Sequence, residues 1–205
     1  MSGFASIIGS NGDDNIVAPL NGSQFIDGNA GDDFIAGLRG NDIILGDAGD
    51  DSLFGGHGAD TIYGGLGNDL IDGGVTRDLI FGGNGADTIF GGNGDDTIYG
   101  GRGLDLIVGG NGDDQMRGGQ GEDIFDFGNQ FGHDLIIGFQ IGVDLLVISS
   151  NINGTGVAAP ADLVPLVSTD PNGNAVITLG TDTITLQGVS PADVTANISG
   201  IVTIV

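Results

Sequence analysis

A chain of 205 residues is long enough for one domain, or two small ones, with a buried core. Its 28 acidic residues face only four arginines and no lysine, and the formal net charge of -24 disfavours nucleic acids and anionic membranes as partners while favouring cations. The absence of cysteine excludes disulfide bonds and thiolate metal sites.

The N-terminal sequence MSGFASIIGSNGDDNI lacks a basic segment, a long apolar segment and a small-residue cleavage site. We therefore expect no N-terminal signal peptide, and residues 1–8 are expected to form a short N-terminal cap. No segment of the sequence approaches the roughly 18 consecutive apolar residues that cross a bilayer, so no membrane span is expected.

A nine-residue repeat follows this cap. Residues 82–90 and 91–99 agree at seven of nine positions, and twelve consecutive units of nine run from Pro19 to Asp126, after a thirteenth at 9–17. The shared pattern is G-G-x-G-x-D-x-U-x, where U is a large apolar residue. Such periodicity indicates a stack of equivalent units.

Two positions of the unit are nearly constant along the chain. The sixth is aspartate in Asp14, Asp33, Asp42, Asp51, Asp60, Asp69, Asp78, Asp87, Asp96, Asp105, Asp114 and Asp123, and only Gln24 departs. The eighth is apolar in Ile16, Ile26, Ile35, Ile44, Leu53, Ile62, Ile71, Ile80, Ile89, Ile98, Ile107, Met116 and Phe125. Glycines in the first six positions permit a tight turn, whereas the last three positions favour a short strand.

These positions predict an all-β fold. In a three-residue strand the middle side chain faces one way and its neighbours face the other, so only the eighth position can supply a core. One buried residue in nine forms no core alone, but stacked coils bring these residues together. Two units per coil give two parallel sheets of short strands, and six coils at about 4.8 Å spacing make a roll roughly 30 Å long.

The aspartates predict a bound metal ion. Stacking places their carboxylates one strand spacing apart, which is unfavourable if the charges stay bare. A hard divalent cation with six or more oxygen ligands resolves this repulsion, and carboxylates with glycine carbonyls are the ligands that calcium prefers. Zinc or copper would favour His or Cys, and His57 and His133 are isolated in the sequence. The sequence therefore predicts calcium.

Residues 9–126 resemble the RTX (repeats-in-toxin) family, the haemolysin-type calcium-binding nonapeptides, which form a right-handed parallel β-roll. The resemblance implies that repeats n and n+2, on the same side of the roll, share one calcium ion. One loop gives the carbonyls of positions two and four and its Asp, and the next gives the carbonyls of positions one and three and its Asp.

Carried onto this sequence, the resemblance assigns aspartate ligands and carbonyl ligands for about ten ions. The aspartates are Asp33, Asp42, Asp51, Asp60, Asp69, Asp78, Asp87, Asp96, Asp105, Asp114 and Asp123. The carbonyl ligands are those of Gly56, Gly58, Gly65, Gly67, Gly82, Gly83, Asn84, Gly85, Gly91, Gly92, Asn93, Gly94, Gly100, Gly101, Arg102, Gly103, Gly109, Asn111, Gly118 and Gln120. Roughly ten ions would supply about +20 of charge and leave the chain mildly acidic.

Sorting the repeats by side separates a continuous row from an interrupted one. The row that begins at Asp14 has an aspartate in every unit, although the extra residue Ala18 puts its first site in doubt. The other row has Gln24, which lacks the charge, and Leu38 and Thr76 at glycine positions. Arg77 also places a cation in that row, beside Asp78. We expect tighter binding in the continuous row.

The charge also predicts a calcium switch. Without calcium, self-repulsion should keep the glycine-rich chain unfolded, and with calcium the binding free energy becomes folding free energy. Extracellular calcium modules typically bind at about 10⁻⁴ to 10⁻³ M, so such sites fill outside the cell and stay empty in the cytosol. We expect an extracellular or cell-surface protein.

Residues 127–205 are expected to form a β-rich, sandwich-like C-terminal cap. The segment FGHDLIIGFQIGVDLLVIS resembles the segment that follows the roll in RTX proteins, and NAVITLGTDTITLQGV predicts a hairpin turning at 180–182. The block 151–173 predicts a surface loop with a short turn at 160–165. In RTX proteins the far C-terminus is an uncleaved type I export signal, and the closing IVTIV fits this or a closing β-strand.

An apolar stripe, Leu45, Tyr63, Phe81 and Tyr99, is a candidate docking surface, or it merely covers the sheet. No H-E-x-x-H, G-x-S-x-G or cysteine nucleophile occurs, so we expect no enzymatic activity. We expect a secreted calcium-binding structural protein that self-associates as a surface-layer, biofilm-matrix or adhesion component. The alternative is an accessory module that binds acidic polysaccharide for a secreted enzyme system.

Overall fold

The computed structural model describes residues 5–18 and 21–205. Expectations that concern residues 1–4 of the N-terminal cap, and Pro19 at the start of the repeat frame, lie outside the described residues.

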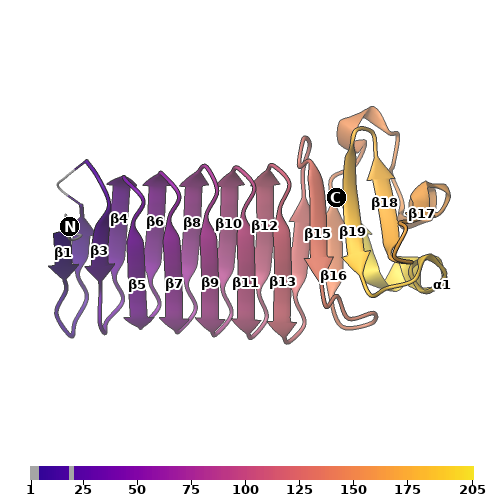
Figure 1. Ribbon diagram of the computed structural model, residues 1–205. Helices are drawn as coiled ribbons and strands as arrows, with labels where there is room; N and C mark the ends of the chain where they lie inside the picture. Colours follow the sequence, from indigo (N-terminus) through magenta and orange to yellow (C-terminus); the bar gives the residue numbers. More distant parts are fainter. Residues whose placement is uncertain (1–4, 19–20) are drawn as a thin grey trace.

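Two sheets extend along the length of the roll (Figure 1). Sheet A has 11 strands in the order β1 (Ala5–Ile8), β3 (Gln24–Asp27), β5 (Ile43–Ala48), β7 (Thr61–Leu66), β9 (Leu79–Asn84), β11 (Thr97–Arg102), β13 (Gln115–Gln120), β15 (His133–Ile137), β19 (Asp182–Gln187), β18 (Ala175–Leu179) and β17 (Val167–Thr169). Sheet B has nine, in the order β2 (Asn15–Val17), β4 (Phe34–Arg39), β6 (Ser52–His57), β8 (Leu70–Val75), β10 (Thr88–Asn93), β12 (Leu106–Asn111), β14 (Ile124–Phe127), β16 (Leu145–Ile148) and β20 (Val202–Ile204).

Successive strands of the repeat region alternate between the sheets, so one coil contains two nonapeptides. In sheet B, Ile89 pairs in parallel with Ile71 on one side and with Ile107 on the other. This register places each residue beside its equivalent two repeats away. The predicted all-β parallel β-roll with two sheets is confirmed.

The strands are longer than the three residues predicted. Most strands of the repeat region span six residues, because backbone pairing continues from the strand into the following pair of glycines, as in Gly92 with Gly110 and Asn93 with Asn111. Only the fourth to sixth positions are left to turn. Pairing through glycine needs no side chain, so residue preferences for strands could not reveal it.

The core is a single file of apolar side chains between the sheets. The eighth-position residues from Ile26 to Phe125 are at most 1% exposed, as the repeat pattern predicted. Ala18, the extra residue between the first two units, is also buried. A single-file core leaves each coil dependent on its immediate neighbours for burial.

Glycine at the fourth position is required by the close stacking of the coils. Gly85 has φ of +133°, and a Cβ there would overlap the carbonyl oxygen of Gly67 in the preceding coil. Leu38 and Thr76, which replace glycine at the second and fourth positions, keep positive φ values of 69° and 83°. The left-handed backbone conformation is therefore retained at both positions with strain, most of all at the β-branched Thr76.

The C-terminal region continues both sheets of the roll. Strands β15 and β16 pair in parallel with β13 and β14, and the predicted hairpin is confirmed as the antiparallel pair β18–β19. The antiparallel strands β17 and β18 end sheet A and fit the expected cap. Two 3₁₀ helices, η1 (Ile152–Gly154) and η2 (Pro160–Leu166), lie in the segment predicted as a loop with a turn.

The chain ends in a helix that the sequence analysis did not predict, followed by a strand. Helix α1 (Pro191–Ile201) begins after Ser190, whose side chain accepts a hydrogen bond from the main-chain N–H of Asp193. Strand β20 then pairs with β16, so the closing β-strand is confirmed. Over residues 5–18 and 21–205, no helix has the length and apolar character needed to cross a membrane.

Candidate metal centre

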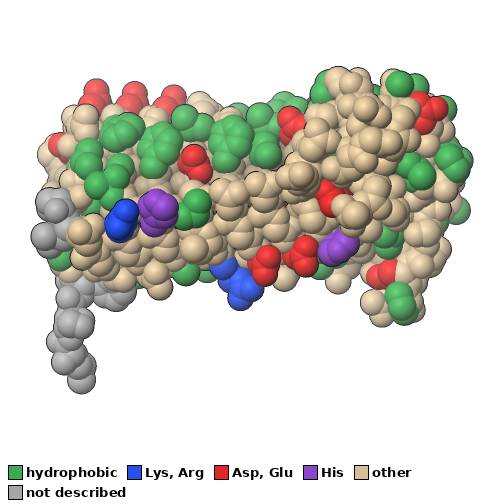
Figure 2. Space-filling view, turned by 90° about the horizontal axis from the view of Figure 1, so that it is seen from above, with side chains coloured by type: hydrophobic (Ala, Val, Ile, Leu, Met, Phe, Trp, Pro, Cys, Tyr) green, Lys and Arg blue, Asp and Glu red, His purple; other side chains and the backbone are tan. Residues whose placement is uncertain are grey.

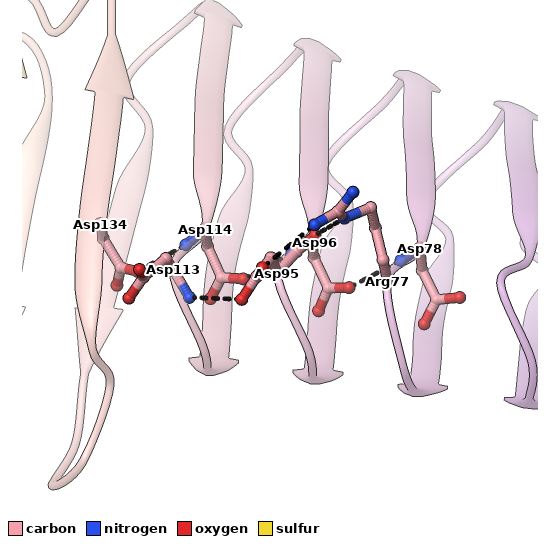
Figure 3. A network of polar contacts seen from close by, with 7 residues as sticks. All are labelled: Arg77, Asp78, Asp95, Asp96, Asp113, Asp114 and Asp134. Carbon is pink, nitrogen blue, oxygen red and sulfur yellow. Dashed lines mark hydrogen bonds and ion pairs between the residues drawn. The ribbon is translucent and has the colours of Figure 1, made fainter.

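The sixth-position aspartates form two hydrogen-bonded rows along the roll. The main-chain N–H of each aspartate donates to Oδ1 of its equivalent in the next coil, as from Asp69 to Asp87 (2.9 Å) and from Asp87 to Asp105 (3.0 Å). The other row includes Asp78, Asp96 and Asp114, joined at 2.7 and 2.8 Å (Figure 3). The aspartates from Asp33 to Asp123 are at most 2% exposed.

The second carboxylate oxygen of these residues has no hydrogen-bond partner. Among the described residues this holds for Oδ2 of Asp33, Asp42, Asp51, Asp60, Asp69, Asp78, Asp87, Asp96, Asp105, Asp114, Asp123 and Asp134. A buried carboxylate oxygen without a partner is strongly unfavourable, and buried charges in proteins are paired or coordinate metals. The regular rows of such oxygens fit a row of cations.

Main-chain carbonyls of adjacent coils lie beside these oxygens. A Cβ built on Gly82 would touch both Oδ2 of Asp87 and the carbonyl oxygen of Gly100 (2.6 Å), so the missing side chain leaves space next to both. The carbonyl oxygen of Gly85 faces Gly103 in the next coil, and that of Arg102 accepts a hydrogen bond from the N–H of Gly85 (2.8 Å). The first- and third-position carbonyls of one coil thus point toward the preceding coil, and the fourth-position carbonyl of that preceding coil points toward the following one. These carbonyls face the same space between the two coils.

The same arrangement recurs at the other predicted ligands. Glycine Cβ positions that would touch the sixth-position carboxylate and the first-position carbonyl of the next coil are found at Gly55, Gly64, Gly73, Gly82, Gly91 and Gly100. Second-position carbonyls face the next coil at Gly56, Gly65, Gly74, Gly83, Gly92 and Gly101. Coordination by these carbonyls remains a prediction.

The donor set consists of oxygen atoms, as a hard cation requires. No three His, Cys, Asp or Glu side chains converge within the described part of the chain, so a metal in the rows would combine carboxylates with main-chain carbonyls. His57 and His133 are exposed. Bound calcium would neutralise the paired carboxylates and complete their coordination.

Burial raises the pKa of the row carboxyls well above the ordinary value of 3.8. The pKa is raised to about 7 for Asp51, Asp60 and Asp96 and to about 8 for Asp78, mainly by desolvation and further by neighbouring aspartates. The N–H donated to each carboxylate opposes this shift. Because the folded pKa is raised, the ionised carboxylates oppose folding of the metal-free chain as pH rises through this range.

Two further aspartates extend the rows beyond the repeat region. The N–H of Asp114 donates to Oδ1 of Asp134 (2.9 Å), and the N–H of Asp123 donates to Oδ1 of Asp144 (3.3 Å). Burial raises the pKa of Asp134 to about 9. These residues were not predicted as ligands from the sequence, because their G-x-D-x-U motifs lack the leading glycine pair and follow spacings of 20 and 21 residues.

The N-terminal ends of the two rows differ from the remainder. The N–H of Asp14 donates to Asp33 (2.8 Å), so Asp14 joins its row despite the extra Ala18. Its Oδ2, however, accepts hydrogen bonds from the N–H and hydroxyl of Ser10. The N–H of Gln24 donates to Asp42 (2.7 Å), which preserves the main-chain contact without a carboxylate at that position.

A second ladder, on the outside of the turns, was not predicted. Fifth-position side chains accept hydrogen bonds in the opposite direction, as Asp50 Oδ1 does from the N–H of Asn68 (2.7 Å). Arg77 belongs to this outer ladder, and its guanidinium forms an ion pair with Asp95 (3.1 Å; Figure 3). Arg77 therefore points to the fifth position of the next coil, where Asp95 partners its charge.

A sequence model of the family described as RTX calcium-binding nonapeptide repeat matches residues 20–53, 37–71, 45–79, 72–107 and 101–136. No curated protein matches the chain. Among solved structures, the extracellular lipase LipA from Serratia marcescens is similar at 21% identity and a TM-score of 0.45, over 100% of this chain and 40% of the lipase. The AlgE6R3 subunit of the Azotobacter vinelandii mannuronan C5-epimerase is similar at 28% identity and a TM-score of 0.48, over 64% of this chain and 78% of that subunit.

The chain thus spans less than half of the lipase to which it is similar. The family matches together cover more than half of the chain and coincide with the coils that hold the aspartate rows. The chain therefore belongs to the family of RTX calcium-binding nonapeptide repeat proteins.

Proposed function

We propose that calcium drives folding of this chain outside the cell, and that the folded roll is a non-catalytic structural protein that self-associates in a surface layer, matrix or adhesive structure. The observation that carries the proposal is the series of buried Oδ2 atoms without partners in the described residues. These carboxylates are unfavourable in the folded chain without a cation, so metal binding and folding are coupled.

The proposed ligand set places each ion between equivalent turns of successive coils. One ion is held by the carbonyls of Gly83 and Gly85 with Asp87, and by Gly100 and Arg102 with Asp105. Support comes from the positions of the Gly100 and Arg102 carbonyls, which point back toward the coil of Asp87. Repetition along both rows gives about ten ions, and Asp134, whose Oδ2 has no partner, allows one more site in its row, whereas Oδ2 of Asp144 accepts a hydrogen bond from the N–H of Gln140 (2.7 Å).

The charge supports folding outside the cell. The net charge of -24 opposes compaction of the free chain, and about ten calcium ions would offset most of it. Sites of extracellular modules bind calcium at about 10⁻⁴ to 10⁻³ M, a concentration absent from the cytosol. The chain would therefore remain unfolded during export and fold afterwards.

Circular dichroism with and without calcium tests the coupling. We expect a disordered chain in chelator and cooperative β-structure at millimolar calcium, while magnesium substitutes poorly because it requires near-octahedral geometry. Equilibrium dialysis with metal analysis should give about ten ions per folded chain. Equal β-structure in chelator and in calcium would contradict the proposal.

Exposed apolar side chains on both sheets support self-association. Tyr63 and Tyr99 are exposed on sheet A, and Leu70 and Phe90 are exposed on sheet B. Figure 2 shows hydrophobic side chains gathered in a band along the roll. Light scattering during a calcium titration should show folding first and concentration-dependent association second, because calcium removes the repulsion between copies.

The outer acidic ladder supports the alternative, an accessory module that binds acidic polysaccharide through bridging calcium. Asp13, Asp32 and Asp50 lie in consecutive coils on the turn surface, each with Oδ1 hydrogen-bonded to the next N–H. Calcium-dependent pull-down on alginate by a protein that stays monomeric would favour this alternative. Concentration-dependent assembly without alginate binding would favour the structural protein.

A further inference from the structure

One column of side chains on the outer face of sheet A is complementary to a second copy of itself placed in the opposite order. The column contains Ile8, Asp27, Leu45, Tyr63, Phe81, Tyr99, Arg117 and Ile137, one from each strand from β1 to β15. Register pairs join its members from Ile8 to Arg117, and Ile137 follows Ile136, the partner of Met116. An acid stands second from one end and the basic Arg117 stands second from the other.

The middle of this column is flat. The rings of Tyr63 and Phe81 stack at 4.8 Å with an interplanar angle of 3°, and those of Phe81 and Tyr99 stack at 5.0 Å with an angle of 6°. Sheets ordinarily twist by about 20° per strand, and flat sheets are typically stabilised by stacking. A flat face can contact a second flat face along its whole length.

Arg117 is available for a partner. It is exposed, and across residues 5–18 and 21–205 its guanidinium has no hydrogen bond or ion pair within the chain, whereas that of Arg77 pairs with Asp95. Arg117 is also the one arginine at the ninth position of a repeat. In a protein with 28 acidic residues, a cation held at the edge of an apolar stripe favours an acidic partner beside a similar stripe.

We propose that two copies of the folded chain pack sheet A against sheet A about a two-fold axis parallel to the strands, so that Asp27 of each copy meets Arg117 of the other. This inference deepens the proposed self-association and rests on it. Such an axis reverses the order of the strands but keeps each column opposite itself. Leu45 then meets Tyr99, Tyr63 meets Phe81, and Ile8 meets Ile137, so every apolar residue of the column has an apolar partner.

Other arrangements match the column less well. A two-fold axis along the roll would place the ninth-position column over the seventh, where Gln115 and Phe25 stand in the strands of Arg117 and Asp27. The corresponding column of sheet B contains Asp72 and Asp126 and no cation. A sugar ring would stack on an open aromatic face, but the faces of Phe81 are covered by Tyr63 and Tyr99.

The expected pair is weak. Eight strands about 4.8 Å apart, with about 7 Å of strand length between the seventh and ninth positions, give a strip of roughly 35 by 7 Å. This strip is smaller than the usual specific interface of about 1,200 Å² or more in total, so we expect weak association that is detected only at high micromolar or higher protein concentration. Like-charge repulsion also makes association depend on bound calcium.

Charge reversal tests the pairing by sedimentation velocity in millimolar calcium. Asp27→Arg alone and Arg117→Asp alone should each shift the dimer to monomer, with the dissociation constant of the dimer raised at least ten-fold relative to wild type. An equimolar mixture of the two variants should recover the dimer, because both contacts are then oppositely charged. Asp72→Arg, at the ninth position of sheet B, and Arg39→Asp, exposed at the end of β4 in sheet B, are matched controls that should leave the dimer unchanged.

Circular dichroism establishes that each variant folds with calcium. Asp27→Asn replaces Asp27→Arg, and Arg117→Gln replaces Arg117→Asp, where the charge reversal does not fold. Loss of the dimer in single variants with recovery on mixing would support the pairing. Wild-type association that charge reversal leaves unchanged, or loss without recovery on mixing, would overturn this pairing while self-association stands. A folded wild-type protein that stays monomeric at high concentration would overturn both the pairing and the proposed self-association.

Discussion

Replacing Asp96 by asparagine tests whether the buried rows hold calcium. Asparagine has nearly the same shape and its Oδ1 can still accept the hydrogen bond from the N–H of Asp78, at 2.7 Å in the native chain. The substitution therefore removes the charge of the orphaned Oδ2 and leaves the backbone contact in place. Two effects of opposite sign follow, one in the metal-free chain and one in the calcium-bound chain.

In the metal-free chain the change relieves an unfavourable charge. The pKa of Asp96 is raised from 3.8 to about 7, so its contribution to stability is fully present below 3.8 and is lost as pH rises through about 7. A shift of about three units corresponds to at most about 4 kcal/mol above that range. In the calcium-bound chain the change removes an attraction of about 4 kcal/mol per unit of cation charge at 4 Å, at an effective dielectric constant of 20.

For a divalent ion the lost attraction is about 8 kcal/mol and the relieved desolvation is about 4, so the folded calcium form loses about 4 kcal/mol. If about ten ions bind together, this loss raises the calcium midpoint by only about two-fold, because it is divided over all the ions. Calcium titration followed by circular dichroism measures the midpoint. The adjacent Asp95→Asn, on the exposed outer ladder, is the matched control and should leave the midpoint unchanged. Equal midpoints for the two variants would refute calcium coordination by the buried row.

Further predictions concern strain, pH and the extension of the rows. Thr76→Gly should lower the calcium midpoint, because it relieves about 1 to 3 kcal/mol of backbone strain at φ of 83°. The control Thr88→Gly, in strand β10, should raise the midpoint. A higher midpoint for Thr76→Gly would contradict the presence of strain at this residue. The calcium midpoint should rise as pH falls from about 8 to about 6, because protons compete with calcium at carboxyls such as that of Asp78, whose pKa is raised to about 8. Calcium titrations at several pH values measure this shift. A constant midpoint would argue against the row carboxylates as calcium ligands. Asp134→Asn should increase proteolysis of the C-terminal region in calcium, with exposed Asp162→Asn as the control, and equal digestion would mean that the row ends at Asp114.

The repeat region could be predicted because one short pattern determines both its core and its candidate site. A residue such as Ile89 is buried, and Asp87 faces the inter-coil space, in every coil for the same local reason. Periodicity also determined the pairing of the strands, since a shift of one residue would expose the core. The sequence pattern was sufficient here because each coil contacts copies of itself.

The parts that were missed depend on contacts between unlike segments. Asp134 and Asp144 complete the rows from motifs without the glycine pair, so the nine-residue count ended before them. Helix α1 had local signals, namely Ser190 at the N-cap, Pro191 at the first position and buried residues four and three apart from Val194 onward. The apolar end of the chain concealed these signals, because it was interpreted as a tail or strand.

The outer ladder was missed because its members differ chemically. Asp50, Asn68 and Ser23 all accept a main-chain N–H from the next coil, although they have little else in common. A search for a constant residue at the fifth position could not find a role that any oxygen-bearing side chain can fill. Hydrogen-bonding capacity, rather than residue identity, was the relevant signal.

The eighteen-residue register of the coils makes length an adjustable property of this protein. Between Gln24 and Asp123 the residues of the roll pair with their equivalents 18 positions away, as Asp69 does with Asp87, so excision of a whole coil joins two surfaces that already match. Removing nine residues instead would exchange the two sheets for everything that follows and present the C-terminal cap to the wrong side. The roll can therefore lengthen by duplication, or shorten by deletion, only in units of two repeats. Its end-to-end distance then changes in steps of about 4.8 Å, so the roll can act as a ruler.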